Sequence, residues 1–255
     1  MDIRMIVTDL DNTLLSGDKR ISDYTAETLA QCMAAGIKVV FATARSMPES
    51  ARILARLSPD AFIGCGGAAS RAGSALLPVF DIPADIADRL ITDCLSSRGI
   101  SYLFVNGEGF ERTNDIELPK QRDFTHYIYD EFETLPGKRC YKISAMCDSP
   151  AEAERVAACF PSLDTTRFSG EDLYRFASPK ATKWNALQNV MAHFGIEARE
   201  TAAFGDDHID VEILQKCGIG VAVANAVDAA RAAADYICGT NDADGVAKWL
   251  RKNLL

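Results

Sequence analysis

Short apolar strands alternate with helical segments over the first eighty residues, and this alternation constrains the fold more than any other feature of the sequence. Residues 5–8, 37–45 and 61–64 are apolar runs typical of buried strands, and helical patterns separate them. Near-continuous apolar strands of this kind favour a parallel sheet that helices cover on both faces. The alternation returns near the end, where a helix over 180–193 precedes a strand at 201–205. The sequence therefore predicts an α/β fold with a doubly wound parallel sheet.

The middle of the chain, at 82–178, breaks this alternation. It combines two helical patterns with several strand-like runs, and the last of these runs form a hairpin around 169–170. Such a mixture predicts an α+β insert within the α/β core. We therefore expect a Rossmann-like core built from 1–81 and 179–255, with an inserted cap domain at 82–178.

Charge and composition disfavour several classes of protein. The 255 residues include 27 basic and 36 acidic side chains, which gives a net charge of −9, whereas nucleic-acid backbones recruit basic surfaces. No apolar run approaches the ~20 residues of a membrane helix, and the first residues do not resemble a signal peptide. The eight cysteines form no CxxC pair, so we interpret most as small buried side chains in a reducing compartment. We expect a cytoplasmic monomer or homodimer, with no nucleic-acid or membrane partner.

Polar side chains gather where the predicted core strands end. They belong to four short segments, which are Asp9-Leu10-Asp11-Asn12-Thr13, Thr43-Ala44-Arg45, the pair Lys180 and Lys183 at the start of a helix, and Gly205-Asp206-Asp207 with Asp210. Ligands of open α/β sheets lie beyond the carboxyl ends of the strands, so we expect these residues in one crevice. Carboxylates that converge with lysines suit Mg²⁺ and a phosphate group. One carboxylate can then act as nucleophile, and a second, two residues on along an extended segment, as general acid and base.

Four motifs, in order, resemble those of the haloacid dehalogenase-like (HAD) hydrolases, and more closely their Cof-type phosphatase branch with an α/β cap. The motifs are DLDNTLL at 9–15, VVFATAR at 39–45, SPKATKWNAL at 178–187 and AFGDDHIDVEIL at 203–214. The tail from residue 220 also resembles that branch, so the resemblance covers essentially the whole chain. A single DxDxT could equally be a turn after a strand. All four motifs in order, with a cap-sized insert between the second and third, favour the enzyme.

The resemblance implies a role for each matching residue. Asp9 is expected to be the nucleophile, and Asp11 to protonate the leaving group and then activate water. Asp9, the Asp11 carbonyl and Asp206 are expected to hold Mg²⁺, with Asp210 in or near the outer shell. The phosphoryl group is expected to be bound by the amides of Leu10 and Ala44, by Thr43 and by Lys183. Lys183 matches the family's lysine better than Lys180 does.

Some positions depart from the family pattern. Asn12 replaces the commoner glycine, and the second motif has TAR in place of TGR. Ile209 stands where the branch usually has asparagine, which bears on the outer metal shell. None of these changes removes a core catalytic group.

We therefore predict a Mg²⁺-dependent phosphatase that hydrolyses small phosphorylated metabolites, with sugar phosphates as candidates, through an aspartyl-phosphate. The cap is expected to close over the substrate and set specificity. A phosphotransferase or phosphomutase on the same scaffold is the alternative among enzymes. Outside enzymes, the alternatives are a phospho-accepting signalling domain, which the large insert and Asp11 disfavour, and a non-catalytic protein that binds phosphorylated metabolites.

Overall fold

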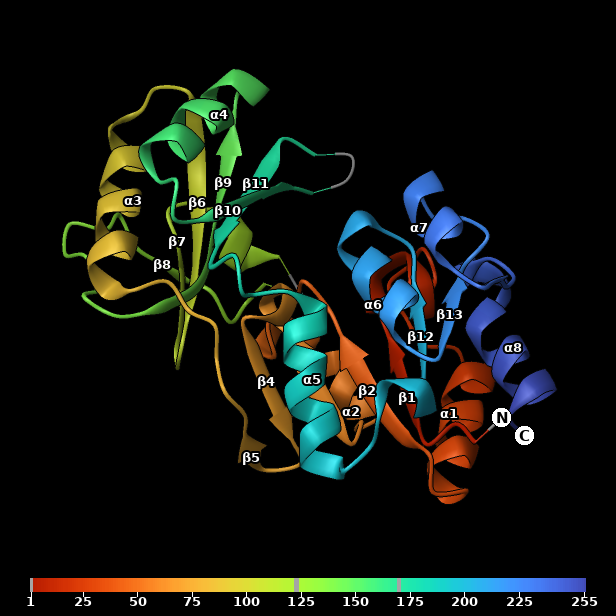
Figure 1. Cartoon of the computed structure of the whole chain (residues 1–255). Coiled ribbons are helices and arrows are strands. Elements are labelled where there is room, and N and C mark those ends of the chain that lie inside the picture. Colours follow the sequence, from red (N-terminus) through yellow and green to blue (C-terminus); the bar gives the residue numbers. More distant parts are fainter. Residues whose placement is uncertain (1, 122–123, 169–170) are drawn as a thin grey trace. The chain divides into compact units, whose positions relative to one another are not determined.

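The chain folds into two compact units, seen in a computed structural model that describes residues 2–121, 124–168 and 171–255 (Figure 1). The first unit joins residues 1–78 to 182–255, and the second spans 79–181. Each border lies three residues from the expected border, at 81 and 178 respectively. Of the described helices, none is long and apolar enough to cross a membrane.

The first unit is built on an eight-stranded sheet. Its strands, in spatial order, are β14 (Tyr236–Ile237), β13 (Ile219–Ala222), β12 (Thr201–Gly205), β1 (Met5–Thr8), β2 (Lys38–Ala42), β3 (Ala61–Gly64), β4 (Ala69–Ala72) and β5 (Ala75–Leu76). The strands from β14 to β3 run parallel to one another. β4 and β5 are antiparallel additions at one edge, which the apolar pattern did not predict. Helices connect β1 to β2, β2 to β3, β12 to β13 and β13 to β14, in agreement with the predicted doubly wound core.

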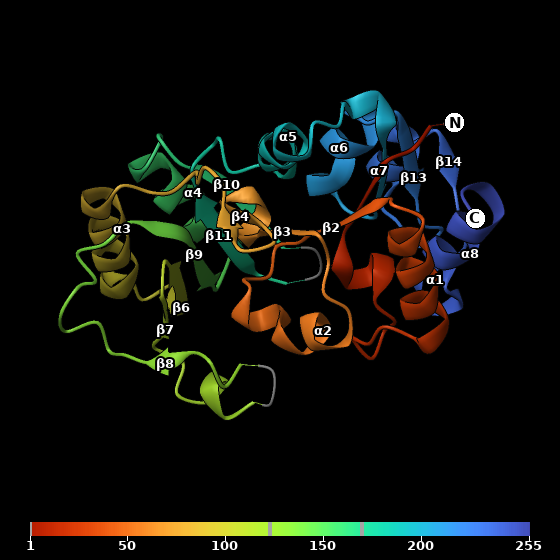
Figure 2. The same ribbon diagram turned by 90° about the horizontal axis from the view of Figure 1, so that it is seen from below.

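Helices cover both faces of this sheet. They are α1 (Asp23–Ala34), α2 (Ala51–Arg56), α5 (Lys183–Phe194), α6 (Val211–Lys216), α7 (Asp228–Ala233) and α8 (Gly245–Asn253). α1 packs against α8 on one face, and α5 packs against α6 on the other (Figure 2). The predicted start of α1 at Ser22 is confirmed, because the Ser22 side chain accepts a hydrogen bond from the amide of Thr25.

The helix expected from Lys180 begins later, at Lys183. Thr182 is its N-cap, and the Thr182 hydroxyl accepts from the amide of Asn185 at 3.1 Å. The helix ends as predicted at Gly195, which has the left-handed conformation typical of a helix stop (φ +62°). The apolar periodicity of the helix did not reveal this start, because the capping side chain defines it.

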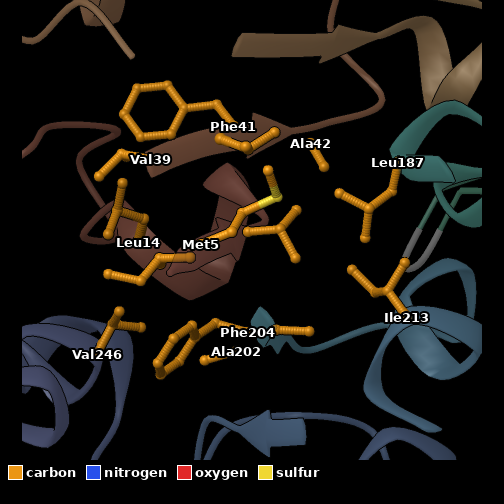
Figure 3. Packing of buried hydrophobic residues seen from close by; sticks show 14 of the residues in the cluster. Met5, Leu14, Val39, Phe41, Ala42, Leu187, Ala202, Phe204, Ile213 and Val246 are labelled. Carbon is orange, nitrogen blue, oxygen red and sulfur yellow. The ribbon is translucent and has the colours of Figure 1, made fainter. Parts of the chain in front are cut away.

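The core of the first unit lies around its central strands. Met5 of β1, Phe41 of β2 and Phe204 of β12 are fully buried, and they pack with Leu187 of α5 and Val246 of α8 (Figure 3). Because these strands are buried on both faces, the sheet gives a rigid support to the loops that follow them.

The second unit has its own six-stranded sheet. In spatial order the strands are β10 (Asp164–Arg167), β11 (Leu173–Ala177), β9 (Cys140–Cys147), β6 (Ile100–Gly107), β7 (Phe110–Thr113) and β8 (Ile128–Tyr129). Its helices, α3 (Ala84–Ser96) and α4 (Pro150–Cys159), belong to a separate apolar core with the strands. β10 and β11 pair antiparallel as the predicted hairpin requires, although its turn at 169–170 lies outside the described residues. The unit is therefore an α+β domain, as predicted.

Candidate active site

Three strand ends bring the first site residues to one edge of the sheet. Thr8, the last residue of β1, pairs in register with Phe41 of β2 and Phe204 of β12. Asp9 follows β1 directly. Thr43 stands two residues after Phe41, and Asp206 stands two residues after Phe204. Parallel strands end at the same edge, so the loops that carry these side chains are neighbours.

A buried cluster of carboxylates surrounds one lysine. Among the described residues, Asp9, Asp206 and Asp210 each offer a carboxylate oxygen, and these oxygens lie within 4.8 Å of one another. Lys183 Nζ donates to Asp9 Oδ1 and to Asp210 Oδ1, each at 2.5 Å. The Lys183 side chain is completely buried, whereas Lys180 is exposed and belongs to the second unit. The structure thus brings together Asp9, Asp206, Asp210 and Lys183 within the first unit.

The charges of this cluster do not balance. Burial and the neighbouring carboxylates raise the pKa of Asp9 well above its usual value, although Lys183 opposes the shift. Burial also raises the pKa of Asp206 to about 6, against a hydrogen bond from Thr13. Burial alone would lower the pKa of Lys183, but Asp210 and Asp9 outweigh it and raise that pKa, so Lys183 is an ammonium. Three carboxylates around one ammonium leave a negative excess that suits a divalent cation, and carboxylate oxygens are the ligands that Mg²⁺ prefers.

Asp210 also organises the loop after β12. Its second oxygen accepts from the amides of Asp206 and Asp207, at 3.1 and 3.2 Å. A Cβ added to Gly205 would lie only 2.4 Å from the Cβ of Asp210, so this approach requires glycine. Asp210 therefore contacts Lys183 and braces the segment that carries Asp206.

A second close approach between backbone segments, at Gly67 and Thr182, positions Lys183. Gly67, just after β3, has φ +105°, and a Cβ there would lie 2.2 Å from the carbonyl oxygen of Thr182. Because Gly67 has no side chain, the backbone at Thr182 can pass against it. The start of α5 is thereby held beside the end of β3, with Lys183 as its first residue.

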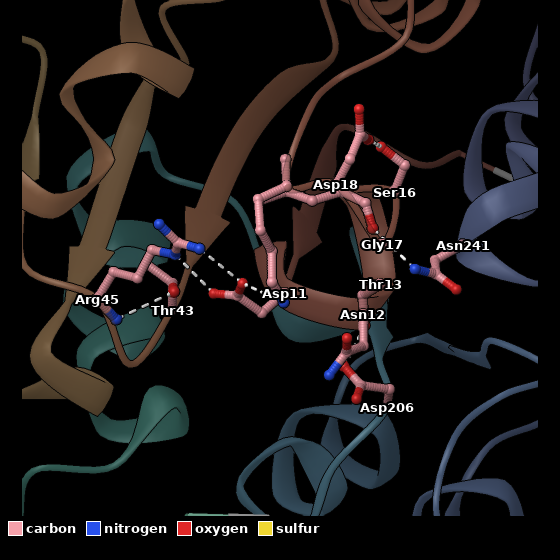
Figure 4. A network of polar contacts seen from close by, with 12 residues as sticks. Asp11, Asn12, Thr13, Ser16, Gly17, Asp18, Thr43, Arg45, Asp206 and Asn241 are labelled. Atoms are coloured by element: carbon pink, nitrogen blue, oxygen red, sulfur yellow. Dashed lines mark hydrogen bonds and ion pairs between the residues drawn. The ribbon is translucent and has the colours of Figure 1, made fainter. Parts of the chain in front are cut away.

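Asp11 lies in different surroundings from Asp9. Arg45 binds both oxygens of the Asp11 carboxylate, at 2.6 and 2.7 Å (Figure 4), and Lys19 Nζ lies 3.0 Å from one of them. Burial would raise the pKa of Asp11, but the hydrogen bonds and charges of Arg45 and Lys19 outweigh it and lower that pKa. The carboxylate of Asp11 thus lies outside the acidic cluster, and its predicted metal contact would come from the backbone carbonyl alone.

The loop after Asp11 explains why asparagine is tolerated at position 12. Asn12 has φ +58°, a left-handed conformation that glycine adopts freely and asparagine more readily than most residues. Its carbonyl accepts from the side chain of Asn225 at 2.7 Å. The next residue, Thr13, donates to Asp206 Oδ1 at 2.5 Å and so links the first and fourth motifs.

The predicted phosphate-binding residues lie in the same unit. The Thr43 side chain is buried, and its hydroxyl accepts from the amide of Arg45 at 3.1 Å. Ala44 is half-buried, and the Leu10 side chain is fully buried in the core. Leu10 is thus an apolar anchor at the start of the loop that carries Asp11.

Comparison with known proteins decides the family. The model of the haloacid dehalogenase-like hydrolases matches residues 6–250. The chain belongs to this family. A solved structure of a HAD subclass IIB sugar phosphatase is 25% identical, with a TM-score of 0.85 over 98% of each chain. The predicted fold class, an α/β core with an inserted cap, is confirmed.

Two curated relatives are similar over most of this HAD hydrolase. The HMP-PP phosphatase of Escherichia fergusonii is 29% identical, over 90% of this chain and 87% of that protein. The chloroplastic endoribonuclease YBEY of Arabidopsis thaliana is 27% identical over 95% of this chain, which spans only 45% of that protein. With the sugar phosphatase, the first of these relatives confirms the prediction of a phosphatase enzyme.

Three residues at the site, Thr13, Arg45 and Lys19, were given no role from the sequence. Thr13 and Arg45 stand inside the quoted motifs, so their positions were available as a signal. Lys19 lies outside every motif, in a polar loop where lysine is ordinarily a solvated surface charge. Only the fold of that loop shows its contact with Asp11.

Proposed function

We propose that this HAD hydrolase is a Mg²⁺-dependent phosphatase, which cleaves small phosphorylated metabolites through a phosphoryl group carried on Asp9. The observation that supports it best is the juxtaposition of Asp9, Lys183 and Asp206 beside a second, separately held carboxylate, Asp11. The similarity to a phosphatase of HMP-PP and to a sugar phosphatase supports phosphorylated metabolites, sugar phosphates among them, as substrates.

The donor set fits a hard divalent cation. Asp9 and Asp206 would hold Mg²⁺, with the Asp11 carbonyl, and Asp210 would stand in or near the outer shell. When bound, the metal neutralises charge on the phosphoryl oxygens. Lys183 supplies a fixed positive charge next to Asp9, and Thr43, with the amides of Leu10 and Ala44, holds the remaining oxygens of the phosphoryl group.

The first half of the reaction transfers the phosphoryl group to the enzyme. A carboxylate oxygen of Asp9 attacks phosphorus, and the bond from phosphorus to the leaving oxygen breaks with its electron pair on that oxygen. Asp11 gives the leaving oxygen a proton, so an alcohol departs. Asp11 has to hold that proton against Arg45 and Lys19, which favour its carboxylate form. Asp9 then carries an acyl phosphate, and Asp11 is a carboxylate.

The second half returns Asp9 to its first state. Asp11 takes a proton from a water molecule whose oxygen attacks phosphorus, and the bond from phosphorus to the Asp9 oxygen breaks. Inorganic phosphate leaves, and Asp11 is protonated again for the next cycle. Asp11 thus gives up one proton and takes one back, Asp9 gains and loses the phosphoryl group, and no further reactant is consumed except water.

The second unit, at 79–181, is the proposed cap that sets specificity. It is an α+β domain inserted between the second motif and α5, the helix that begins at Lys183. Closure of such a domain would exclude bulk water from the reaction. We further propose a cytoplasmic monomer or homodimer that needs neither nucleic acid nor membrane.

A panel of phosphate esters tests this function. The purified protein is incubated with Mg²⁺ and each ester, and free phosphate is measured beside a Mg²⁺-free control. We expect Mg²⁺-dependent release from several sugar phosphates, together with a phosphoryl adduct on the peptide that contains Asp9 after rapid quenching in acid. Transfer to another hydroxyl without free phosphate would instead identify a phosphotransferase or mutase, and release without an adduct would contradict the role of Asp9.

A further inference from the structure

Two groups of charged side chains stand around the segment that follows β1 in the first unit. Asp9, Asp206 and Asp210 share the single ammonium of Lys183, which leaves an excess of negative charge. Two residues from Asp9, the single carboxylate of Asp11 faces the cations of both Arg45 and Lys19. Two cations thus meet beside one carboxylate, and an anion bound there would contact both of them.

Asp11 does not require Lys19 to hold its side chain in place. Arg45 already binds both carboxylate oxygens of Asp11 in the bidentate arrangement that holds a carboxylate best. Lys19 Nζ approaches Oδ1, which already accepts from Arg45. An arginine alone would fix the side chain, so the orientation of Asp11 does not account for the second cation.

The loop that carries Lys19 is fixed in place. The amide of Ser16 donates to the Arg20 carbonyl at 3.0 Å, and the amide of Lys19 donates to the Ser16 carbonyl at 2.8 Å. The amide of Gly17 donates to Asp242 Oδ1 at 2.7 Å. Lys19 itself has φ +60°, a conformation that is costly for a residue with a side chain. The backbone at Lys19 is thus fixed, and the Lys19 ammonium lies against Asp11.

The two groups also differ in access. The Lys183 side chain is completely buried, whereas the side chains of Lys19 and Asp11 are 43% and 31% exposed and that of Arg45 is 21% exposed. A molecule can therefore reach Lys19 and Arg45 from solvent. In the proposed reaction Asp11 meets the leaving oxygen, so the atoms next to that oxygen meet these cations.

We propose that Lys19 and Arg45 form a second anion subsite, on the leaving-group side of Asp11. It selects substrates whose leaving group carries its own anionic group close to the scissile bond, a phosphate or a carboxylate. This inference rests on the proposed phosphatase function and narrows its substrate class. Lys19 contributes chiefly to the choice of substrate, because the transferred phosphoryl group itself is held by Lys183, Thr43 and the backbone amides.

The test compares three small substrates in Lys19→Met. 2-Phosphoglycolate has a leaving group with a carboxylate, inorganic pyrophosphate has one that is itself a phosphate, and 2-hydroxyethyl phosphate has a neutral one of similar size. Arg20→Met is the matched control, because it removes the same charge from the same loop but its guanidinium pairs with Asp18. The measured quantity is the ratio of kcat/KM for an anionic leaving group to kcat/KM for the neutral one.

We expect the wild-type ratio to favour at least one anionic leaving group, and Lys19→Met to lower it about tenfold, the effect of one charge-assisted hydrogen bond. Arg20→Met should keep the wild-type ratio. Whether pyrophosphate or 2-phosphoglycolate loses more identifies the anion that the subsite takes. An equal loss of kcat/KM on all three substrates would show that Lys19 only positions Asp11, and a wild-type ratio near one would refute the subsite directly.

A binding measurement separates this proposal from the phosphatase function. Calorimetry with Mg²⁺ compares methylenediphosphonate, which cannot be hydrolysed, with methylphosphonate, which lacks the second anionic group. We expect Lys19→Met to weaken only the diphosphonate, about tenfold, and Arg20→Met to weaken neither. This result would support the subsite even if no ester released phosphate, and equal affinities in wild type and Lys19→Met would overturn it.

Discussion

At the scale of single residues, Asp9 and Asp11 are two positions apart but have opposite electrostatic surroundings. Asp9 is buried among carboxylates that raise its pKa, and Asp11 is held by two cations that lower its pKa. The spacing in DLDNT indicated that both carboxylates are near the strand end, but it could not indicate this difference. The difference arises from the burial of Asp9 beside Asp210 and Asp206 and from the cations Arg45 and Lys19 beside Asp11, all of which lie outside the DLDNT motif.

Asp9→Asn should abolish turnover and also stabilise the metal-free protein. Asparagine cannot form the acyl phosphate, so we expect kcat to fall on the order of 10⁴-fold or more. The substitution also removes one buried charge from an over-acidic cluster, so thermal unfolding in EDTA should occur at a higher temperature than in wild type. The gain in stability from added Mg²⁺ should shrink. Turnover near that of the wild type would remove Asp9 as the nucleophile.

Lys183→Met should lower both activity and stability, because it leaves Asp9 and Asp210 buried without their shared cation. Removal of one partner from a buried ion pair costs about 3–5 kcal/mol, and loss of a charge next to the reacting phosphoryl group costs about 10²–10³-fold in kcat. Lys180→Met is the comparison, since Lys180 is exposed in the other unit. Urea unfolding and steady-state kinetics on both variants check this, and a larger effect at Lys180 would contradict the assignment.

At the scale of elements, the parallel strands of the first unit and their order along the chain were predictable, whereas β4, β5 and the starts of some helices were not. Short, near-continuous runs of apolar residues identify buried strands from the local sequence alone. The start of α5 depends on the Thr182 cap and on Gly67, more than a hundred residues earlier. Such a long-range approach leaves no local pattern, which is why Lys180 and Lys183 could be ranked only through the family motif.

Gly67→Ala should destabilise the protein more than Gly36→Ala does. Both glycines have positive φ, +105° and +86°, so both substitutions strain the backbone. Only at Gly67 would the new Cβ meet a backbone carbonyl, 2.2 Å away, whereas nothing lies within 4 Å at Gly36. We expect a difference in unfolding free energy of at least about 2 kcal/mol by urea denaturation, with reduced phosphate release from Gly67→Ala because α5 carries Lys183. Equal costs would show that the Thr182 backbone yields easily.

At the scale of the whole molecule, the chain divides into two units with separate apolar cores, and the described acidic cluster belongs entirely to one of them. The change from alternating strands and helices to a mixed segment was visible in sequence because each unit follows its own pattern. The chemistry of the second unit was not visible in the sequence, since its polar side chains form no recognisable motif. Its contribution to specificity therefore stays a prediction.

Magnesium should stabilise the two units unequally. A ligand that binds only the folded state adds RT ln(1 + [L]/Kd) to stability, about 2.7 kcal/mol at 100 times Kd. Asp9, Asp206 and Asp210 all lie in the unit formed by 1–78 and 182–255, so the added stability should appear there. Amide hydrogen exchange with and without Mg²⁺ measures this: exchange should slow in peptides of the first unit and stay constant in those from 79–181. Asp206→Asn should reduce the protection. Equal protection across 79–181 would mean that the two units unfold as one.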